Sequence, residues 1–358
     1  MAGTMKAAVL LGKGKVAIED RPIPSPKANE VLLKIQRVGV CGSDVHYYTH
    51  GRIGQFVVKE PLILGHEASA TVAGLGRDVK NLSEGDRVAI EPGYTCRTCR
   101  YCKSGLYNLC PEVVFLATPP VDGAFCQYLA WPADFVFKVP EAMTFDQAAM
   151  MEPTAVALWS CRRAPIQAGA SVAVFGAGPI GAMTIQVARA LGAATIIAVD
   201  LDDWRLEQAE RFGARYTINA RRIEDSAETI RTLIQEQTGE PSTTAGVDVA
   251  FETAGAVATT RAALASVRPA GSAMLVGLPP DPQVALDIVS AASRELQIKG
   301  QFRYANCYPP SIALAESGAI DPGAIVTHHL PLEKAEEALQ MSASPEPGTL
   351  KIIINVAG

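Results

Sequence analysis

The 358-residue sequence predicts an α/β protein in which a β-rich N-terminal domain precedes a doubly wound parallel sheet. An apolar strand, a glycine-rich turn and a helix follow one another within residues 171–190. From there to about residue 302, short apolar segments alternate with helical ones, as in a doubly wound sheet. Before residue 156, by contrast, short apolar runs such as 30–36 and 87–90 are separated by Gly and Pro, which indicates a compact β-rich domain. A chain of this length is also expected to form two domains.

The elements of the parallel unit can be placed along the chain. We expect strands at residues 173–175, 195–199, 216–219, 247–252, 273–276 and 296–302, and helices at 180–190, 227–237 and 256–267. The run LKIIINV within residues 349–356 predicts a last strand beyond this unit, so we expect the tail to return to the first domain. The predicted boundaries are therefore residues 1–155 for the first domain, 156–294 for the parallel unit and 295–358 for the return.

The glycine-rich turn has the spacing of a dinucleotide-binding fingerprint. Gly176, Gly178 and Gly181 follow a strand and open a helix. In that motif the first glycine makes a tight turn, the second lets the backbone approach the pyrophosphate, and the third allows close helix–strand packing. Asp200 lies nineteen residues after Gly181, at the end of the next strand, where the motif requires an acid.

We expect Asp200 to bond the ribose hydroxyls of the coenzyme and to repel a 2′-phosphate, which favours NAD over NADP. Leu201 follows it where an NADP site would place Arg, and Arg205 is the nearest cation. Ligands of such sheets bind outside the carboxyl ends of the strands. The remaining expected coenzyme contacts lie in the turn or at strand ends and are Pro179, Ile180, Thr253, Val276, Gly277, Leu278, Phe302 and Arg303.

Four of the eight cysteines are gathered in one polar loop, at Cys96, Cys99, Cys102 and Cys110. The two-residue gaps bring neighbouring thiolates onto one ion, and the seven-residue gap lets the loop return to close the site. Four thiolates with no open position are typical of structural zinc. An iron–sulfur cluster is the alternative, although its cysteine run ends with a three-residue gap. Reduced thiols without metal are a further alternative.

A second set of possible metal ligands is open rather than closed. Cys41, His66 and Glu67 offer a sulfur, an imidazole and a carboxylate, and Glu152 offers a further carboxylate. Catalytic zinc typically keeps three protein ligands and one position for water or substrate. The sequence does not decide whether Glu67 or Glu152 binds the ion directly.

Composition excludes several other classes of protein. The net charge of −5 and the scattered basic residues argue against nucleic-acid binding. The nearly uncharged stretch 172–199 is better explained as strand, turn, helix and strand than as a membrane span. The N-terminal residues show no signal-peptide pattern, so we expect a cytoplasmic protein with reduced thiols.

Several short segments together resemble one enzyme family. They are CGSDVHYYTHGRIG, GHEAS, ATPPVDG, MEPTAV, CRRA, GAGPIG and QFRYAN. With them the chain is similar to the zinc-containing medium-chain dehydrogenases, and within these to the polyol group of sorbitol and xylitol dehydrogenases. It departs from that pattern at Ala70, usually Gly, and at Trp131 and Trp159, where polyol relatives usually have His.

The resemblance implies a groES-like catalytic domain, a Rossmann domain and a homotetramer. The two independent sets of ligands predict two zinc ions per chain, one catalytic and one structural, although some of the polyol group lack the four-cysteine site. The resemblance also implies NAD-linked oxidation of a polyol such as xylitol or sorbitol to a ketose. Ser43 and His46 look like the proton relay, while Tyr47, Glu152, Arg303 and Tyr304 are expected to meet the hydroxyls of the substrate. A simple alcohol or threonine dehydrogenase on the same scaffold is an alternative, as is a non-enzymatic relative that only binds coenzyme.

Overall fold

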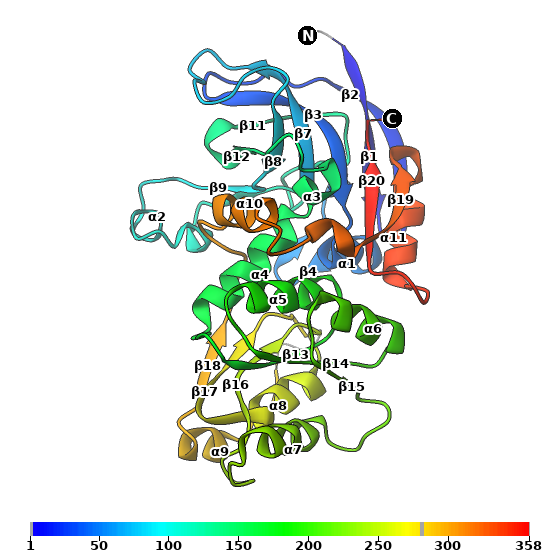
Figure 1. The fold of residues 1–358 in the computed structure, drawn as a ribbon. Helices are drawn as coiled ribbons and strands as arrows, with labels where there is room; N and C mark the ends of the chain where they lie inside the picture. Colours follow the sequence, from blue (N-terminus) through cyan, green and yellow to red (C-terminus); the bar gives the residue numbers. More distant parts are fainter. Residues whose placement is uncertain (1–2, 280–282, 358) are drawn as a thin grey trace. The chain divides into compact units, whose positions relative to one another are not determined.

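The computed structural model describes residues 3–279 and 283–357. The chain divides into two compact units (Figure 1). One contains Met1–Glu152 together with Tyr308–Gly358, and the other contains Pro153–Cys307. The first unit is therefore built from the two ends of the chain, and its last strand lies beside strands from the N-terminal segment.

The first unit is mainly β-structure. Its largest sheet has the order β12-β8-β7-β3-β20-β19, and β11 also pairs with β3. These strands are β3 (Glu30–Gly39), β7 (Glu67–Leu75), β8 (Arg87–Ile90), β11 (Tyr128–Pro132), β12 (Val136–Lys138), β19 (Val326–Pro331) and β20 (Lys351–Asn355). A second sheet has the order β2-β1-β6, from β1 (Thr4–Gly12), β2 (Lys15–Pro22) and β6 (Leu62–Ile63). A short hairpin pairs β4 (Arg52–Ile53) with β5 (Phe56–Val57). The two-stranded pair of β9 (Gly93–Tyr94) and β10 (Val114–Phe115) closes the base of the long loop between them.

The helices of this unit are short. They are α1 (Gly42–His50), α2 (Arg100–Lys103), α3 (Phe145–Ala149), α10 (Tyr308–Glu316) and α11 (Ala335–Ala343), with single 3-10 turns at Tyr107–Leu109, Ala133–Phe135, Pro322–Ile325 and Leu332–Lys334. The core lies on the apolar faces of the strands. In β3, Val31, Leu33 and Ile35 on one face are fully buried, and Leu32 on the other face is buried as well, so this end of the strand is covered on both sides.

The second unit is the predicted doubly wound sheet. Its strand order is β15-β14-β13-β16-β17-β18, and every neighbouring pair is parallel. The strands are β13 (Ser171–Phe175), β14 (Thr195–Asp200), β15 (Tyr216–Asn219), β16 (Val247–Glu252), β17 (Val267–Leu275) and β18 (Gln297–Gly300). The helices are α4 (Met151–Arg163), which starts in the first unit, α5 (Pro179–Ala190), α6 (Asp203–Phe212), α7 (Ser226–Thr238), α8 (Val257–Ser266) and α9 (Ile288–Ser293).

The sheet order reverses at β13, from which the chain proceeds outward first to β14 and β15 and then to β16. In β13, Val172, Ala173 and Val174 are all fully buried, so the strand is covered on both faces. An uninterrupted apolar run is typical of such central parallel strands. No helix within the described ranges is long and apolar enough to cross a membrane.

The unit boundaries differ from the predicted ones. The return to the first unit begins at Tyr308 and not at 295, because β18 pairs in parallel with β17 and so belongs to the second sheet. The second unit begins at Pro153 and not at 156, inside helix α4. The helix expected at 256–267 ends at Ser266, since Val267 already begins β17. The C-terminal tail returns to the first unit as predicted, because its strand β20 is hydrogen-bonded to β3.

Candidate active site and metal centres

The first candidate site lies where β3 ends and β7 begins. Cys41 follows the last residues of β3, His66 precedes β7, and Glu67 is the first residue of β7. The register of the two strands sets Glu67 opposite Gly39. As a result, ligand atoms of Cys41, His66 and Glu67 all lie within 4.8 Å of one another.

A buried carboxylate holds the two ligand segments together. Asp44, the third residue of α1, is fully buried. Its Oδ2 accepts the backbone N–H of Cys41 at 3.0 Å, and its Oδ1 accepts that of Gly65 at 2.9 Å. The same Oδ1 lies 3.8 Å from Nδ1 of His66. Sequence reasoning missed this residue, although an acid three residues after the N-cap residue, here Cys41, is a recognised signal of a capping interaction.

Glu67 is enclosed by two residues that sequence reasoning also missed. Nζ of Lys351 lies 2.7 Å from its Oε1 and 2.5 Å from its Oε2. On the other strand, a Cβ added to Gly39 would lie 2.0 Å from Oε2 of Glu67 and 2.7 Å from Cε of Met150. Only glycine at position 39 therefore leaves room for the Glu67 carboxylate.

The charges of the site act on one another strongly. Burial by itself lowers the pKa of His66, but the Cys41 sulfur and the Asp44 carboxylate raise it well above its usual value. Burial also lowers the pKa of Lys351, while Glu67, Cys41 and Glu152 raise it above its usual value. The acidic groups around His66 and Lys351 thus favour the positively charged form of both side chains, and the same negative charge would stabilise a metal cation.

The donor set fits a zinc ion. Thiolate, imidazole and carboxylate are the three ligand types that zinc accepts, and three protein ligands leave a fourth position open. Glu152, which is 5% exposed in the first turn of α4, is not part of the set of Cys41, His66 and Glu67. Its charge nevertheless acts on Lys351 and Glu91, so it lies in the same region of the unit.

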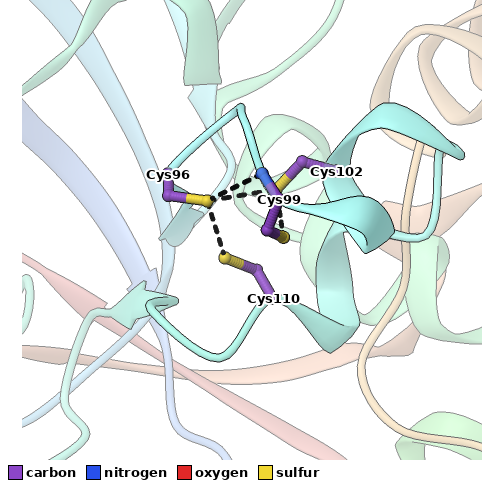
Figure 2. Close-up of side chains that lie close together, drawn as sticks. All are labelled: Cys96, Cys99, Cys102 and Cys110. Atoms are coloured by element: carbon purple, nitrogen blue, oxygen red, sulfur yellow. Dashed lines mark hydrogen bonds between the residues drawn. The ribbon is translucent and has the colours of Figure 1, made fainter.

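The four-cysteine loop forms a compact cluster of sulfur atoms (Figure 2). The Sγ–Sγ distances are 3.6 Å from Cys96 to Cys110, 3.9 Å from Cys96 to Cys102 and 3.5 Å from Cys99 to Cys102. Sulfur atoms about 2.3 Å from a central ion in a tetrahedron are about 3.8 Å apart, whereas a disulfide requires about 2.05 Å. Hydrogen bonds from the backbone of Thr98 and Cys99 lower the pKa of Cys96 to about 6, which favours the thiolate. The cluster fits a closed tetrahedral zinc site.

Contacts on both sides tie this loop to the rest of the unit. The Tyr107 hydroxyl donates to Oε1 of Glu91 at 2.7 Å, and Arg97 contacts Asp134 through two nitrogens at 2.7 and 2.8 Å. Burial raises the pKa of Glu91 to about 8. Trp131, one of the departures from the polyol pattern, is buried and donates its indole N–H to the Glu91 carbonyl at 2.9 Å. In this chain the indole N–H of Trp131 therefore has a hydrogen-bond partner within the unit.

The glycine turn of the second unit has the geometry that the fingerprint requires. Helix α5 begins directly after Gly178, with Pro179 as its first residue. A Cβ at Gly181 would lie 1.8 Å from the Gly176 carbonyl oxygen, so the third glycine permits the close approach of helix and turn. The backbone N–H groups at this helix end supply the positive end of the helix dipole to an anion.

Asp200 lies at the edge of this turn. Its Oδ2 accepts the Ala177 N–H at 2.7 Å, and its Oδ1 accepts the N–H groups of Leu201 at 2.7 Å and Asp202 at 3.0 Å. Arg205 lies on α6, half-buried. The carboxylate expected to bind ribose and the turn expected to bind phosphate are therefore adjacent.

Thr253 joins the end of β16 to the turn, and Glu252, which sequence reasoning did not single out, joins the end of β16 to that of β17. Thr253 donates its hydroxyl to the carbonyls of Phe175 at 2.9 Å and Gly176 at 2.8 Å. The buried Glu252 accepts the N–H of Gly255 at 2.8 Å, and its carbonyl accepts the N–H groups of Val276 and Gly277 at 2.9 Å. Leu278 and Phe302 are 70% and 44% exposed. Exposed apolar side chains at strand ends suit contact with a flat coenzyme ring.

The expected relay and substrate residues are divided between the units. Ser43, His46 and Tyr47 all lie on α1, where Tyr47 is buried and His46 is exposed. Burial and the neighbouring His50 lower the pKa of His46. Arg303 and the buried Tyr304 belong to the second unit, as does Ile180, the second residue of α5 and an expected coenzyme contact. The roles of these residues stay predictions.

Comparison with known proteins agrees with this geometry. Residues 27–141 match the model of the alcohol dehydrogenase GroES-like domain, and residues 179–317 match that of the zinc-binding dehydrogenases. A sorbitol dehydrogenase from Bacillus subtilis is 45% identical over 98% of this chain and 97% of its own. The human sorbitol dehydrogenase is 43% identical over 93% of this chain and 91% of its own. The crystal structure of 2R,3R-butanediol dehydrogenase from Bacillus subtilis has a TM-score of 0.88, with 30% identity and coverage of 99% and 100%.

Fold and site together define a two-domain oxidoreductase that acts on CH–OH groups, with a GroES-like domain and a Rossmann domain. The chain belongs to the zinc-binding dehydrogenase family. This confirms the family and fold expected from the sequence motifs.

The first prediction concerns the space beside Glu67. Gly39→Ala should displace the Glu67 carboxylate, because the new Cβ would overlap Oε2. We expect a loss of about 1–3 kcal/mol in the free energy of unfolding from overpacking, together with weaker zinc retention. Gly42→Ala is the matched control, because a Cβ there has no heavy atom within 4 Å. Zinc content after dialysis and thermal denaturation measure both effects, and equal behaviour of the two variants would contradict the role of Gly39.

The second prediction concerns the four-cysteine cluster. Cys96→Ser should release one zinc ion per chain and lower the Tm by about 5 °C, since losing a structural metal belongs to the costly class of changes, about 4 kcal/mol or more. The buried Cys126→Ser, outside the cluster, is the control and should keep both ions. A Cys96→Ser protein with normal stability but no turnover would show that the cluster serves catalysis rather than the fold.

Proposed function

We propose that this chain oxidises a secondary alcohol group of a polyol, such as sorbitol or xylitol, to a ketone, with NAD as the hydride acceptor. The observation that carries the proposal is the set of three different zinc donors, Cys41, His66 and Glu67, within 4.8 Å of one another. The choice of a polyol is supported by the sorbitol dehydrogenases that are 42–45% identical to the chain.

When bound, zinc would act as a Lewis acid on the substrate hydroxyl and NAD would accept the hydride. Cys41, His66 and Glu67 would hold the ion, and Asp44 fixes two of these segments through the backbone of Cys41 and Gly65. The proton of the substrate hydroxyl has to leave the site.

Ser43 and His46 are our candidates for moving that proton, because a hydroxyl both accepts and donates and a histidine titrates near neutral pH. The lowered pKa of His46 keeps its imidazole neutral at neutral pH, in the form that can accept a proton. Tyr47, Glu152, Arg303 and Tyr304 are our candidates for bonding further hydroxyls of the polyol.

The coenzyme contacts proposed are those of the glycine turn, with Asp200 bonding the ribose. A homotetramer in the cytoplasm completes the proposal, and its mass in solution can be measured by light scattering. The four-cysteine cluster would hold the second zinc ion.

The third prediction tests the metal-dependent reaction. Cys41→Ser should abolish polyol oxidation while leaving NAD binding largely intact, because a serine hydroxyl is a far poorer zinc ligand than a thiolate. Coenzyme titration by fluorescence reports binding, and turnover is measured with xylitol, sorbitol, galactitol and ribitol beside primary alcohols, 2,3-butanediol and threonine. Preferred turnover of threonine or a simple alcohol by the unaltered chain would replace the polyol assignment. Near-normal turnover of Cys41→Ser would reject the zinc ligand.

The fourth prediction concerns the coenzyme. Asp200→Ala combined with Leu201→Arg should raise the ratio of kcat/KM for NADP to that for NAD by about 100-fold, because repulsion is removed and a charged donor is added. Since Asp200 also accepts the Ala177 N–H, Asp200→Ala alone should weaken both coenzymes. The ratio is therefore the measurement, with Leu201→Arg alone as control. An unchanged ratio would show that Asp200 does not face the ribose.

A further inference from the structure

Lys351 is a buried cation directly behind the proposed catalytic zinc site. It is the first residue of β20 and is only 3% exposed. Its Nζ lies 2.7 Å from Oε1 and 2.5 Å from Oε2 of Glu67, and 2.9 Å from the Val40 carbonyl oxygen. The ammonium group therefore donates hydrogen bonds to Oε1 of Glu67 and to the Val40 carbonyl oxygen. Its contact with Oε2 is an ion pair, and Oε2 has no hydrogen-bond partner among the described residues.

Burying an ammonium group is expensive unless it is paired and hydrogen-bonded. This lysine is compensated by Glu67, and Glu67 is compensated by it, so the pair is neutral in the protein without metal. Glu67 is also one of the three donors that lie within 4.8 Å of one another. The Glu67 carboxylate would thus interact with two cations, the Lys351 ammonium group and the zinc ion.

These two interactions oppose each other. A zinc ion on Cys41, His66 and Glu67 would draw electron density from the carboxylate to which Lys351 is hydrogen-bonded at Oε1 and ion-paired at Oε2. It would also place a second positive charge near the ammonium group, where the low local dielectric strengthens the repulsion. Coupling between two interactions is reciprocal. If zinc binding weakens the interaction between Lys351 and Glu67, that interaction must weaken zinc binding by the same free energy.

We propose that Lys351 is a positioning residue that competes with the catalytic zinc ion for Glu67, so that it stabilises the metal-free fold and lowers the affinity of the site for zinc. This inference rests on the proposed function, in which Cys41, His66 and Glu67 hold the ion. A lysine that only filled space would affect the metal-free and metal-loaded protein equally.

The test compares three variants of the full chain. Lys351→Met keeps the length of the side chain without its charge, Lys351→Arg keeps the charge, and Glu67→Gln with Lys351→Met removes both charges. Lys138→Met is the control, because Lys138 pairs with Asp86 at 2.6 Å on the exposed surface. Zinc affinity is measured by competition with a chromophoric chelator, and the Cys41→Ser protein identifies which of the two zinc ions belongs to this site. Thermal denaturation is recorded with this ion present and removed.

We expect Lys351→Met to bind zinc about 10- to 100-fold more tightly, whereas loss of an outer-shell partner that supports a ligand changes metal affinity on the same scale but weakens it. Its Tm without the ion should fall by several degrees, and zinc should restore most of the loss. Lys351→Arg should bind zinc as the unaltered chain does. The double variant should recover stability without metal but bind zinc more weakly than the unaltered chain, since it lacks a charged ligand. Lys138→Met should leave the zinc affinity unchanged.

Unchanged or weaker zinc binding by Lys351→Met would overturn the inference. If Lys351→Met is obtained only in unfolded form, a folded double variant supports the claim that Lys351 and Glu67 compensate each other's buried charge, and an unfolded double variant overturns it. The proposed function fails separately, if Cys41→Ser retains as much zinc as the unaltered chain.

Discussion

The pairing of β20 with β3 is the constraint on which the metal site depends. This contact joins residues from the two ends of the first unit, and it brings the backbone of Val40 and the side chain of Lys351 to the point where β3 ends. On the opposite edge of β3, the register with β7 sets Glu67 against Gly39. The Glu67 carboxylate therefore has room because residue 39 is glycine, and its negative charge is paired with the positive charge of Lys351.

The segments that carry the zinc ligands are held in place by a residue that is not itself a ligand. Asp44 fixes the backbone of the two ligand segments, at Cys41 and at Gly65, and it is not itself one of the three donors that would hold the ion. The coenzyme half uses a similar arrangement, because the Glu252 carboxylate accepts the N–H of Gly255 in the segment after β16, which pairs with the strand that leads into the glycine turn. In both units a buried carboxylate accepts backbone N–H groups and so defines the shape of a loop that binds something else.

The sequence predicted best what is encoded locally. Gly176, Gly178 and Gly181 lie within six residues, and the four clustered cysteines within fifteen, so their spacing alone specifies the geometry. Lys351 could not be found in this way, because it is 284 residues from Glu67 and sits in an apolar strand where a lysine reads as a surface residue. The unit boundary at Tyr308 was placed too early for a related reason. A short segment such as β18 reveals which sheet it joins only through pairing with β17, a contact between strands.

The distance along the chain between Glu67 and Lys351 also has a consequence for synthesis. A ribosome adds about 5–20 residues per second, so about 15–60 s separate the two residues of this pair. Throughout that interval Glu67 exists without its lysine, and the end of β3 that later pairs with β20 presents free backbone groups, the kind of edge that recruits other strands. A metal ion that arrives early would meet a carboxylate with no competing cation. The nascent chain would thus take up zinc under different conditions from the finished one.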